Sequence, residues 1–290
     1  MDIRSFDERI RAAREKLAEA GAVVIGAGAG LSAAAGLDYS GPEFRKEFGD
    51  YIAKYGFPDL YTSSFHEFPT EEERWARWAR HIDYARYRPE AFPLYRKLRE
   101  LVEGKNYFVI TTNVDAQFRK AGFAVDRIFE VQGDYGLMQC AVGCHPKVYS
   151  NRKAVEDILR HSHDLTVAPE YVPVCPECGG NMDVHVRKNG YFVQDEAWNE
   201  AAARYERFMD KYAEKGKVVL LELGIGFNTP AIIRFPFEQV TYRNREATLV
   251  RLNSEYPTGP RETASQTISF TESMASTLDA LDAPAMPKKD

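Results

Sequence analysis

Two apolar runs of the sequence are each followed closely by polar side chains that could bind a ligand. Asn113 and Asp115 follow the first run, residues 107–110, and Gln132 and Asp134 follow the second. Amide side chains donate and accept hydrogen bonds, and carboxylates can also take up a proton. Because open parallel sheets bind ligands at the carboxyl ends of their strands, this pattern predicts a polar ligand site at such an edge.

The apolar runs belong to a series that predicts the supporting sheet. Strands are expected at residues 22–25, 107–110, 128–131, 218–223 and 248–252. A first helix is expected over about residues 6–20, because Ser5 and Glu8 form a capping box and Gly21 supplies the stop. Strands that alternate with helical patterns predict an α/β fold with a Rossmann-like doubly wound parallel sheet.

Two insertions interrupt this sheet. Residues 42–103 show strong helical periodicity without a buried strand, and predict an inserted helical module. Residues 137–193 hold all four cysteines with short β-rich pieces, and predict a zinc-ribbon module. The Rossmann-like domain is then assigned residues 1–41, 104–136 and 194–282, and residues 283–290 are expected to be a disordered tail.

The cysteines fall into two close pairs, Cys140-x-x-x-Cys144 and Cys175-x-x-Cys178. Tetrahedral zinc takes four such ligands from two turns, although the first spacing is one residue longer than usual. A closed site of four thiolates leaves no open coordination position, so the predicted zinc is structural. The same segment holds four histidines that could replace a cysteine, but we expect them to be surface or packing residues: His145, His161, His163 and His185.

A glycine-rich turn follows the first predicted strand. Residues 26–30 read Gly-Ala-Gly-Ala-Gly, and residues 31–35 can start a helix. Glycines let the backbone approach a pyrophosphate, and a helix N-terminus adds free amide groups. A tight turn between strand and helix explains the same glycines without a ligand. Residues 224–230, Gly-Ile-Gly-Phe-Asn-Thr-Pro, form a similar strand end, where Pro230 is expected to open the next helix.

Composition indicates a globular protein with its own core. The chain has 290 residues, of which 44% are hydrophobic and 12% aromatic, and its formal net charge is −5. This balance argues against nucleic acid and membrane surfaces as partners. The charged N-terminal segment lacks the apolar stretch of a secretory signal, so a cytoplasmic location is expected.

Several motifs together resemble the sirtuin family. They are GAGAGLSAAAGLDYSG, TTNVD, VQGDYG and GIGFNTP, and the combination is most similar to the macrodomain-linked class M sirtuins. The position of the family's catalytic histidine holds Gln132, which cannot remove a proton as deacylation requires. The resemblance therefore implies a NAD-dependent protein mono-ADP-ribosyltransferase that releases nicotinamide. It further implies a lipoyl carrier protein of the glycine-cleavage H type as acceptor, and a macrodomain hydrolase in the same pathway.

The resemblance also implies roles for individual residues. Asn113, Asp115 and Gln132 are the expected catalytic residues, and Asp134 is a candidate for assisting the nucleophile. Tyr39 is expected to cover the nicotinamide, with Arg45 as a substitute for a missing family arginine. The full expected set of NAD-binding residues is Gly26, Ala27, Gly28, Leu31, Asp38, Tyr39, Thr112, Asn113, Asp115, Gln132, Gly224, Ile225, Gly226, Asn228 and Asn253.

Two other functions remain open at this point. One is a NAD-dependent protein deacylase or NAD glycohydrolase, and the other is a non-catalytic sensor of NAD or ADP-ribose. One helical segment of the first insertion carries aromatic residues expected in the core, Trp75, Trp78, Tyr84 and Tyr87. Its arginines are expected to be a solvated face, with a basic docking surface for an acidic carrier as the alternative: Arg74, Arg77, Arg80, Arg86 and Arg88.

Overall fold

The protein, a computed structural model that describes residues 4–283, contains a large parallel sheet and a small antiparallel sheet. The large sheet has the strand order β3-β2-β1-β7-β8-β9, and every neighbouring pair in it is parallel. Its strands are β1 (Ala22–Ala27), β2 (Tyr107–Thr111), β3 (Ile128–Glu130), β7 (Val218–Leu223), β8 (Thr248–Leu252) and β9 (Thr267–Phe270). The chain runs outward from β1, then returns to β7 and runs the other way, so the predicted doubly wound sheet is confirmed.

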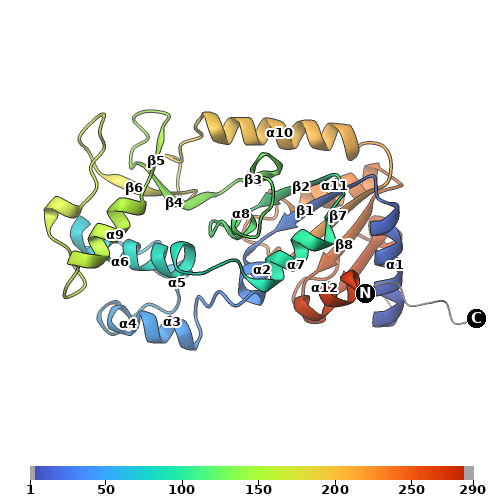
Figure 1. Cartoon of the computed structure of the whole chain (residues 1–290), viewed down its shortest axis with the longest axis horizontal. Coiled ribbons are helices and arrows are strands. Elements are labelled where there is room, and N and C mark those ends of the chain that lie inside the picture. The colour runs from blue at the N-terminus through green and yellow to red at the C-terminus, as the bar shows by residue number, and fades with distance from the viewer. Residues whose placement is uncertain (1–3, 284–290) are drawn as a thin grey trace, which may run out of the picture.

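Helices cover both faces of the large sheet (Figure 1). One face packs against α1 (Phe6–Glu19), α7 (Pro93–Leu101) and α12 (Met274–Asp282), and the other against α10 (Glu196–Tyr212) and α11 (Arg234–Arg243). Leu17, Leu98 and Leu281 are buried on the first face, and Phe237 on the second. Two short helices, α2 (Ala29–Ala34) and α8 (Gln117–Lys120), follow β1 and β2 at the carboxyl edge of the sheet.

The other lobe combines the two insertions (Figure 1). Its antiparallel sheet has the order β5-β4-β6, with β4 (Gly133–Cys140), β5 (Val148–Ser150) and β6 (Met182–Val186). Its helices are α3 (Pro42–Glu47), α4 (Gly49–Tyr55), α5 (Leu60–Ser63), α6 (Glu71–Ile82), a π-helix η1 (Asp83–Tyr87) and α9 (Arg152–His161). Trp75, Trp78 and Ile82 of α6 share one buried cluster with Val155 and Ile158 of α9. The helical and cysteine-rich insertions therefore pack as one body.

Most of the elements expected from the sequence are present. The capping box of α1 is formed, with the Glu8 amide donating to the Ser5 hydroxyl at 3.3 Å. The five expected strands all occur, while β9 and α9 were not foreseen. The prediction that Pro230 opens a helix is wrong, because Pro230 lies in a turn and α11 begins at Arg234.

The predicted domain limits remain a proposal, and two elements bear on them. Helix α7, inside the segment 42–103, packs in the core of the large sheet, and β4 runs across the limit between residues 136 and 137. Of the predicted tail 283–290, all but the first residue lies outside the described part of the chain. Within residues 4–283, no helix has the length and apolar character needed to cross a membrane.

Candidate active site and metal centre

A cavity of about 1040 Å³ opens at the carboxyl edge of the large sheet, where the strand order reverses between β1 and β7. Its walls come from both lobes: the segments after β1, β2, β7 and β8 on one side, and Tyr61, Trp78 and Arg187 on the other. Ligands of doubly wound sheets bind at this place, because the loops diverge there and leave a crevice. The cavity is large enough for a dinucleotide-sized ligand.

The glycine-rich turn brings two loops of this cavity into backbone contact. A Cβ on Gly30 would lie 2.7 Å from the Gly224 Cα, and a Cβ on Gly28 would lie 2.9 Å from the Gly224 carbonyl oxygen. Gly224 itself has a φ of 62°, which favours glycine. The close approach of the two loops thus requires these glycines without any ligand, and both loops also line the cavity.

Asn113 and Asp115 lie at the bottom of the cavity in one hydrogen-bond network. The Ser32 hydroxyl donates to the Asp115 carboxylate at 2.6 Å and lies 2.9 Å from the Tyr95 hydroxyl. The Asn113 side-chain nitrogen, Nδ2, donates to the Gly28 carbonyl at 3.0 Å and to the Tyr95 hydroxyl at 3.3 Å. Both side chains are more than nine-tenths buried, so their geometry is held by this network.

The surroundings of Asp115 shift the pKa of its carboxyl group. Burial raises the pKa of this carboxyl, against hydrogen bonds from Ser32 and from the Gln117 amide that lower it. The Gln117 backbone amide donates to the Asp115 carboxylate at 3.0 Å just before α8, whose N-cap residue is Ala116. Ser32 lies in the glycine-rich motif but was not expected in the site, and Tyr95 carried no sequence signal because it comes from α7.

Gln132 lines the same cavity and is anchored through its backbone. Its carbonyl oxygen accepts from the Arg187 amide at 2.9 Å, and the next residue, Gly133, is held against the His185 carbonyl with a φ of 97°. Within residues 4–283, the Gln132 side-chain amide has no hydrogen-bond partner, so both of its polar atoms are available to a ligand.

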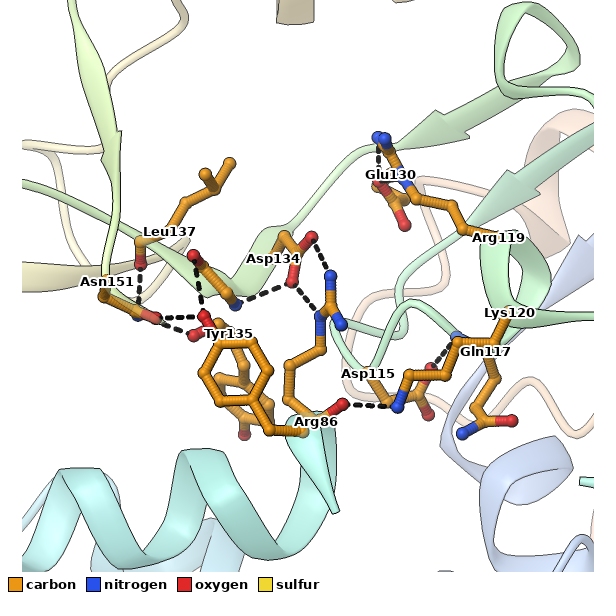
Figure 2. Close-up of polar contacts among 12 residues, drawn as sticks. Arg86, Asp115, Gln117, Arg119, Lys120, Glu130, Asp134, Tyr135, Leu137 and Asn151 are labelled. Atoms are coloured by element: carbon orange, nitrogen blue, oxygen red, sulfur yellow. Dashed lines mark hydrogen bonds and ion pairs between the residues drawn. The ribbon is translucent and has the colours of Figure 1, made fainter. Parts of the chain in front are cut away.

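Asp134 does not line the cavity, which differs from the expectation that it assists a nucleophile. Its carboxylate accepts from Arg86 Nε at 2.7 Å, from Arg86 Nη2 at 3.2 Å and from the Gly136 amide at 2.7 Å (Figure 2). Both carboxylate oxygens are thus engaged by Arg86, and one of them also by Gly136. Asp134 therefore holds structure next to Gln132.

The segment expected to cover the cofactor forms one wall of the cavity. Asp38 and Tyr39 both line it, and the Asp38 carboxylate accepts from backbone amides at the start of α3, including that of Glu43 at 3.0 Å. Burial, together with the neighbouring Tyr135, raises the pKa of Tyr39. Arg45 is exposed on α3 and is absent from the cavity lining, so it does not replace the missing arginine.

The opposite end of the cavity is formed by the loops after β7 and β8. Ile225, Asn228 and Asn253 line it. The Asn253 side-chain nitrogen, Nδ2, donates to the Ile225 carbonyl at 2.7 Å. The Asn253 side-chain oxygen accepts from the Tyr256 amide at 2.9 Å and from the Glu255 amide at 3.1 Å. This one side chain therefore connects both loops.

The predicted cofactor residues divide into two groups. Those that line the cavity are Gly28, Asp38, Tyr39, Thr112, Asn113, Asp115, Gln132, Gly224, Ile225, Gly226, Asn228 and Asn253. Gly26, Ala27 and Leu31 are outside its lining. Ala27 and Leu31 are fully buried in the core, and a Cβ on Gly26 would meet Ile233 at 2.5 Å. These three positions serve the packing beneath the site.

The four cysteines meet at one point of the second lobe. Their sulfur atoms all lie within 4.8 Å of one another, with 3.8 Å between Cys140 and Cys178 and 3.7 Å between Cys144 and Cys175. Zinc–sulfur bonds of about 2.3 Å in a tetrahedron place sulfurs about 3.8 Å apart, so the cluster fits zinc. His145 lies 3.0 Å from the Cys144 sulfur through Nδ1, next to the cluster.

The arginines of α6 and η1 do not form a basic docking surface. Arg77 is fully buried, and Arg86 and Arg74 are paired with Asp134 and Asp183. The two remaining arginines pair with acidic residues of the same lobe, Arg80 with Asp50, and Arg88 with Asp83 and Glu47. The expected solvated face is reduced to Arg80 and Arg88, whose side chains are 28% and 48% exposed. No basic docking surface forms, because each of the five guanidinium groups is buried or has a carboxylate beside it. Trp75 and Trp78 are buried, as expected.

The fold and the cavity define a dinucleotide-binding α/β protein with a cysteine-clustered second lobe. The Sir2 family pattern matches residues 28–210 of the chain. A protein ADP-ribosyltransferase of Staphylococcus aureus is 34% identical over 94% of this chain and 88% of its own length. The chain therefore belongs to the sirtuin (Sir2) family, whose members use NAD.

Other relatives and solved structures agree with this assignment. A probable bifunctional ADP-ribose hydrolase/ADP-ribosyltransferase of Fusarium oxysporum f. sp. cubense is 34% identical over 80% of this chain, which spans 40% of that relative. A Sir2 homologue solved in complex with NAD matches with a TM-score of 0.58 at 16% identity, over 94% of this chain and 92% of that one. At that identity the structural match supports the fold alone.

Proposed function

We propose that this sirtuin is a NAD-dependent protein mono-ADP-ribosyltransferase. The observation that carries the proposal is the cavity lining, in which Gln132 accompanies Asn113 and Asp115 and in which, among the described residues, no histidine occurs. Sirtuin deacylation requires a group that removes a proton from the ribose, and an amide cannot do so. Transfer of ADP-ribose needs only positioning and charge stabilisation. The names of the two relatives support the same activity.

The proposed roles are those that the family resemblance implies, and they are supported by the positions of these side chains in the cavity lining. NAD supplies the group transferred: the acceptor bonds to ribose C1′ as the bond to nicotinamide breaks, nicotinamide keeps the bonding electron pair, and the acceptor proton passes to solvent. Asn113 and Asp115 hold the carboxamide and the nicotinamide ribose, and Gln132 positions the ribose or the acceptor. Tyr39 covers the nicotinamide. The loop joined by Asn253 holds the adenosine end.

The metal has a separate role in this proposal. Cys140, Cys144, Cys175 and Cys178 hold zinc, and because all four coordination positions are taken by thiolates the ion organises the second lobe. Cys140 and Cys175 belong to the same buried cluster as Trp78, which lines the cavity. Zinc thus supports the wall of the site without contacting the reacting groups.

The acceptor in this proposal is a lipoylated carrier protein of the glycine-cleavage H type, and a macrodomain hydrolase reverses the modification. The relative that carries both ADP-ribose hydrolase and transferase in its name supports the pairing of the two activities. A cytoplasmic location, expected from the sequence, belongs to the same proposal.

The test is a transfer assay with NAD labelled in the adenosine part. Purified protein is incubated with the lipoylated carrier and, in parallel, with the carrier lacking lipoate. The expected result is label on the lipoylated carrier and one nicotinamide released for each label, with loss of both in Gln132→Ala and Asn113→Ala. Intact NAD with no labelled protein would contradict the proposal and leave a sensor. Free ADP-ribose without labelled protein would indicate a glycohydrolase.

A second variant separates transfer from deacylation. Gln132→His restores a titratable group at this position of the cavity. If the missing base is what blocks deacylation, this variant gains turnover of acyl-lysine peptides that the wild type lacks. A wild type that already turns over such peptides would favour the deacylase function instead.

A further inference from the structure

The π-helix η1 joins the two segments that carry the polar residues of the site. It continues α6 directly, and its wide turn is closed by the Arg88 amide donating to the Asp83 carbonyl at 2.8 Å. Single π-turns interrupt helices rarely and occur often beside functional sites. Here the turn lies between the segment after β2 and the first residues of β4 (Figure 2).

Side chains of η1 bind the start of β4 through an ion pair and a chain of hydrogen bonds. The Arg86 guanidinium forms the two bonds to Asp134 described above, and the side chains of this pair are 17% and 11% exposed. Gly136 makes room for the pair, since a Cβ there would lie 3.2 Å from both Arg86 Nε and Nη2. The hydroxyl of the next residue in η1, Tyr87, donates to the Asn151 side-chain oxygen at 2.6 Å, and Asn151 in turn donates to the Tyr135 carbonyl at 2.7 Å.

Backbone carbonyls of η1 and of the residues just after it bind α8. The Lys120 ammonium donates to the Arg86 carbonyl and, at 2.6 Å, to the Pro89 carbonyl. Lys120 ends the short helix α8, which begins two residues after Asp115. The start of β4 and the segment before α8 also contact each other directly, because the Tyr135 backbone amide donates to the Val114 carbonyl at 2.9 Å. The backbone around Asp115 and the backbone around Gln132 are thus tied to the same turn.

We propose that Arg86 is a positioning residue for ADP-ribosyl transfer, which sets Gln132 against Asp115 through its pair with Asp134. The proposal rests on the function proposed above. It explains why a charged pair is kept almost out of solvent two residues from Gln132, where burying charges is costly. It also replaces a direct role of Asp134 toward the acceptor, because both of its oxygens are taken by Arg86, one of them also by Gly136.

The test compares Arg86→Gln, Asp134→Asn and the double variant with a control, Arg88→Gln. Arg88 lies at the end of the same turn, but its partners are Asp83 and Glu47, outside the site. We measure kcat and KM for NAD in transfer, nicotinamide exchange into NAD, and the thermal midpoint. Each single variant is expected to lose about 100-fold in kcat and in exchange, with KM changed less than about threefold, since a small misplacement can cost that much. The control keeps its rates.

The double variant separates positioning from stability. Removing both charges leaves no unpaired buried charge, so its midpoint should recover toward the wild type. Its kcat and exchange rate should stay low, because the ion pair that holds the start of β4 against η1 is still absent. Recovery of the rates together with the midpoint would overturn the proposal, as would a normal rate in Arg86→Gln or a rise in KM alone.

Nicotinamide exchange distinguishes failure of this inference from failure of the function. Exchange requires cleavage of the bond between ribose C1′ and nicotinamide and its re-formation with labelled nicotinamide from solution, and it is measured without a protein acceptor. A wild type that exchanges nicotinamide but labels no protein would contradict the transferase, while the comparison of the Arg86 variants would still decide the positioning role.

Discussion

The two ends of the cavity are stabilised by buried charges in different ways. At the end formed by the loops after β7 and β8, Arg251 and Glu222 are fully buried and form two bonds of 2.8 and 2.9 Å. Arg251 Nη2 also contacts the Glu238 carboxylate at 2.8 Å, and Arg251 Nη1 donates to the Thr258 carbonyl at 2.8 Å. All of these groups belong to the large sheet, α11 and the loop after β8.

The charges at the Gln132 end come from four elements of the chain. Arg86 is supplied by the inserted helical segment, Asp134 by β4, and the pair Arg119 and Glu130 by α8 and the end of β3 (Figure 2). The end formed by β7 and β8 therefore depends on the sheet, α11 and the loop after β8, whereas the Gln132 end also depends on how the second lobe docks. This difference predicts that perturbing the second lobe impairs the chemistry before it impairs cofactor binding.

The largest expected effect is that of removing zinc. Structural zinc contributes about 10 kcal/mol or more to small domains, so a chelator or Cys175→Ser should release the metal and open the second lobe. Hydrogen exchange should then show lost protection in β4, β6 and α9 and retained protection in β1, β7 and β8. If the second lobe stays protected after the metal has left, its shared apolar core with α6 is sufficient and the comparison loses its basis.

Breaking the buried pair at the other end should come next. Glu222→Gln leaves Arg251 without its carboxylate partner in the core, which should cost about 3–5 kcal/mol of unfolding free energy. Urea unfolding measures this, with Glu19→Gln as the control for a pair whose side chains are half exposed. An equal effect in the control would mean that burial of the Glu222 pair has no special weight.

One source of pH dependence in folding stability should lie at the Gln132 end. Burial, with the negative Asp134 nearby, raises the pKa of Glu130 to about 7 against the opposing effect of Arg119. An unfolded glutamate titrates near 4.3, so between about pH 5 and pH 7 the folded protein holds a proton that the unfolded chain has released. Folding stability therefore falls as pH rises through this window.

Glu130→Gln tests this by removing the titrating group. From about pH 5 to pH 8 the wild type should lose about 1–3 kcal/mol of unfolding free energy more than the variant, as measured by urea unfolding. Glu206→Gln, an exposed position on α10, is the matched control. The same pH slope in wild type and Glu130→Gln would exclude Glu130 as the source.

The smallest expected effect concerns Asn253. Asn253→Ala removes the connection between the loops after β7 and β8, and should raise KM for NAD about tenfold, which corresponds to about 1.4 kcal/mol, with kcat unchanged. Asn253→Asp keeps the acceptor for the Tyr256 amide and loses the donor to Ile225. Its KM for NAD should therefore lie between those of the wild type and Asn253→Ala. A fall in kcat at constant KM would show that the two ends of the cavity are not independent.

Much of the fold could be predicted because its signals are local. The strands of the large sheet are runs of apolar residues, and the capping box of α1 involves residues three apart, so short windows contain the information. Strand β9 was missed because Thr267–Phe270 is short and partly polar, and α9 because its segment was assigned to a metal ribbon. The start of α11 was misplaced because Pro230 suits a turn as well as a first helical position.

The candidate site was predictable only in part. Residues just after strands were found, because strand ends define the edge where ligands bind. Ser32, Tyr95 and Arg86 were not recognised as parts of the site's surroundings, since each acts through a contact distant in sequence. Gly26, Ala27 and Leu31 were included from the motif, although they pack in the core.

The sequence by itself determined the parallel sheet, the four-cysteine metal site, the family resemblance and the replacement of a titratable base by Gln132. These follow from residue type and short spacing, which need no knowledge of distant contacts. Only the tertiary structure decided that Asp134 is bound by Arg86, that the arginines of α6 and η1 are buried or paired, and that both insertions share one core. Those facts depend on which distant segments meet, because burial and pairing of charges are properties of the packed chain.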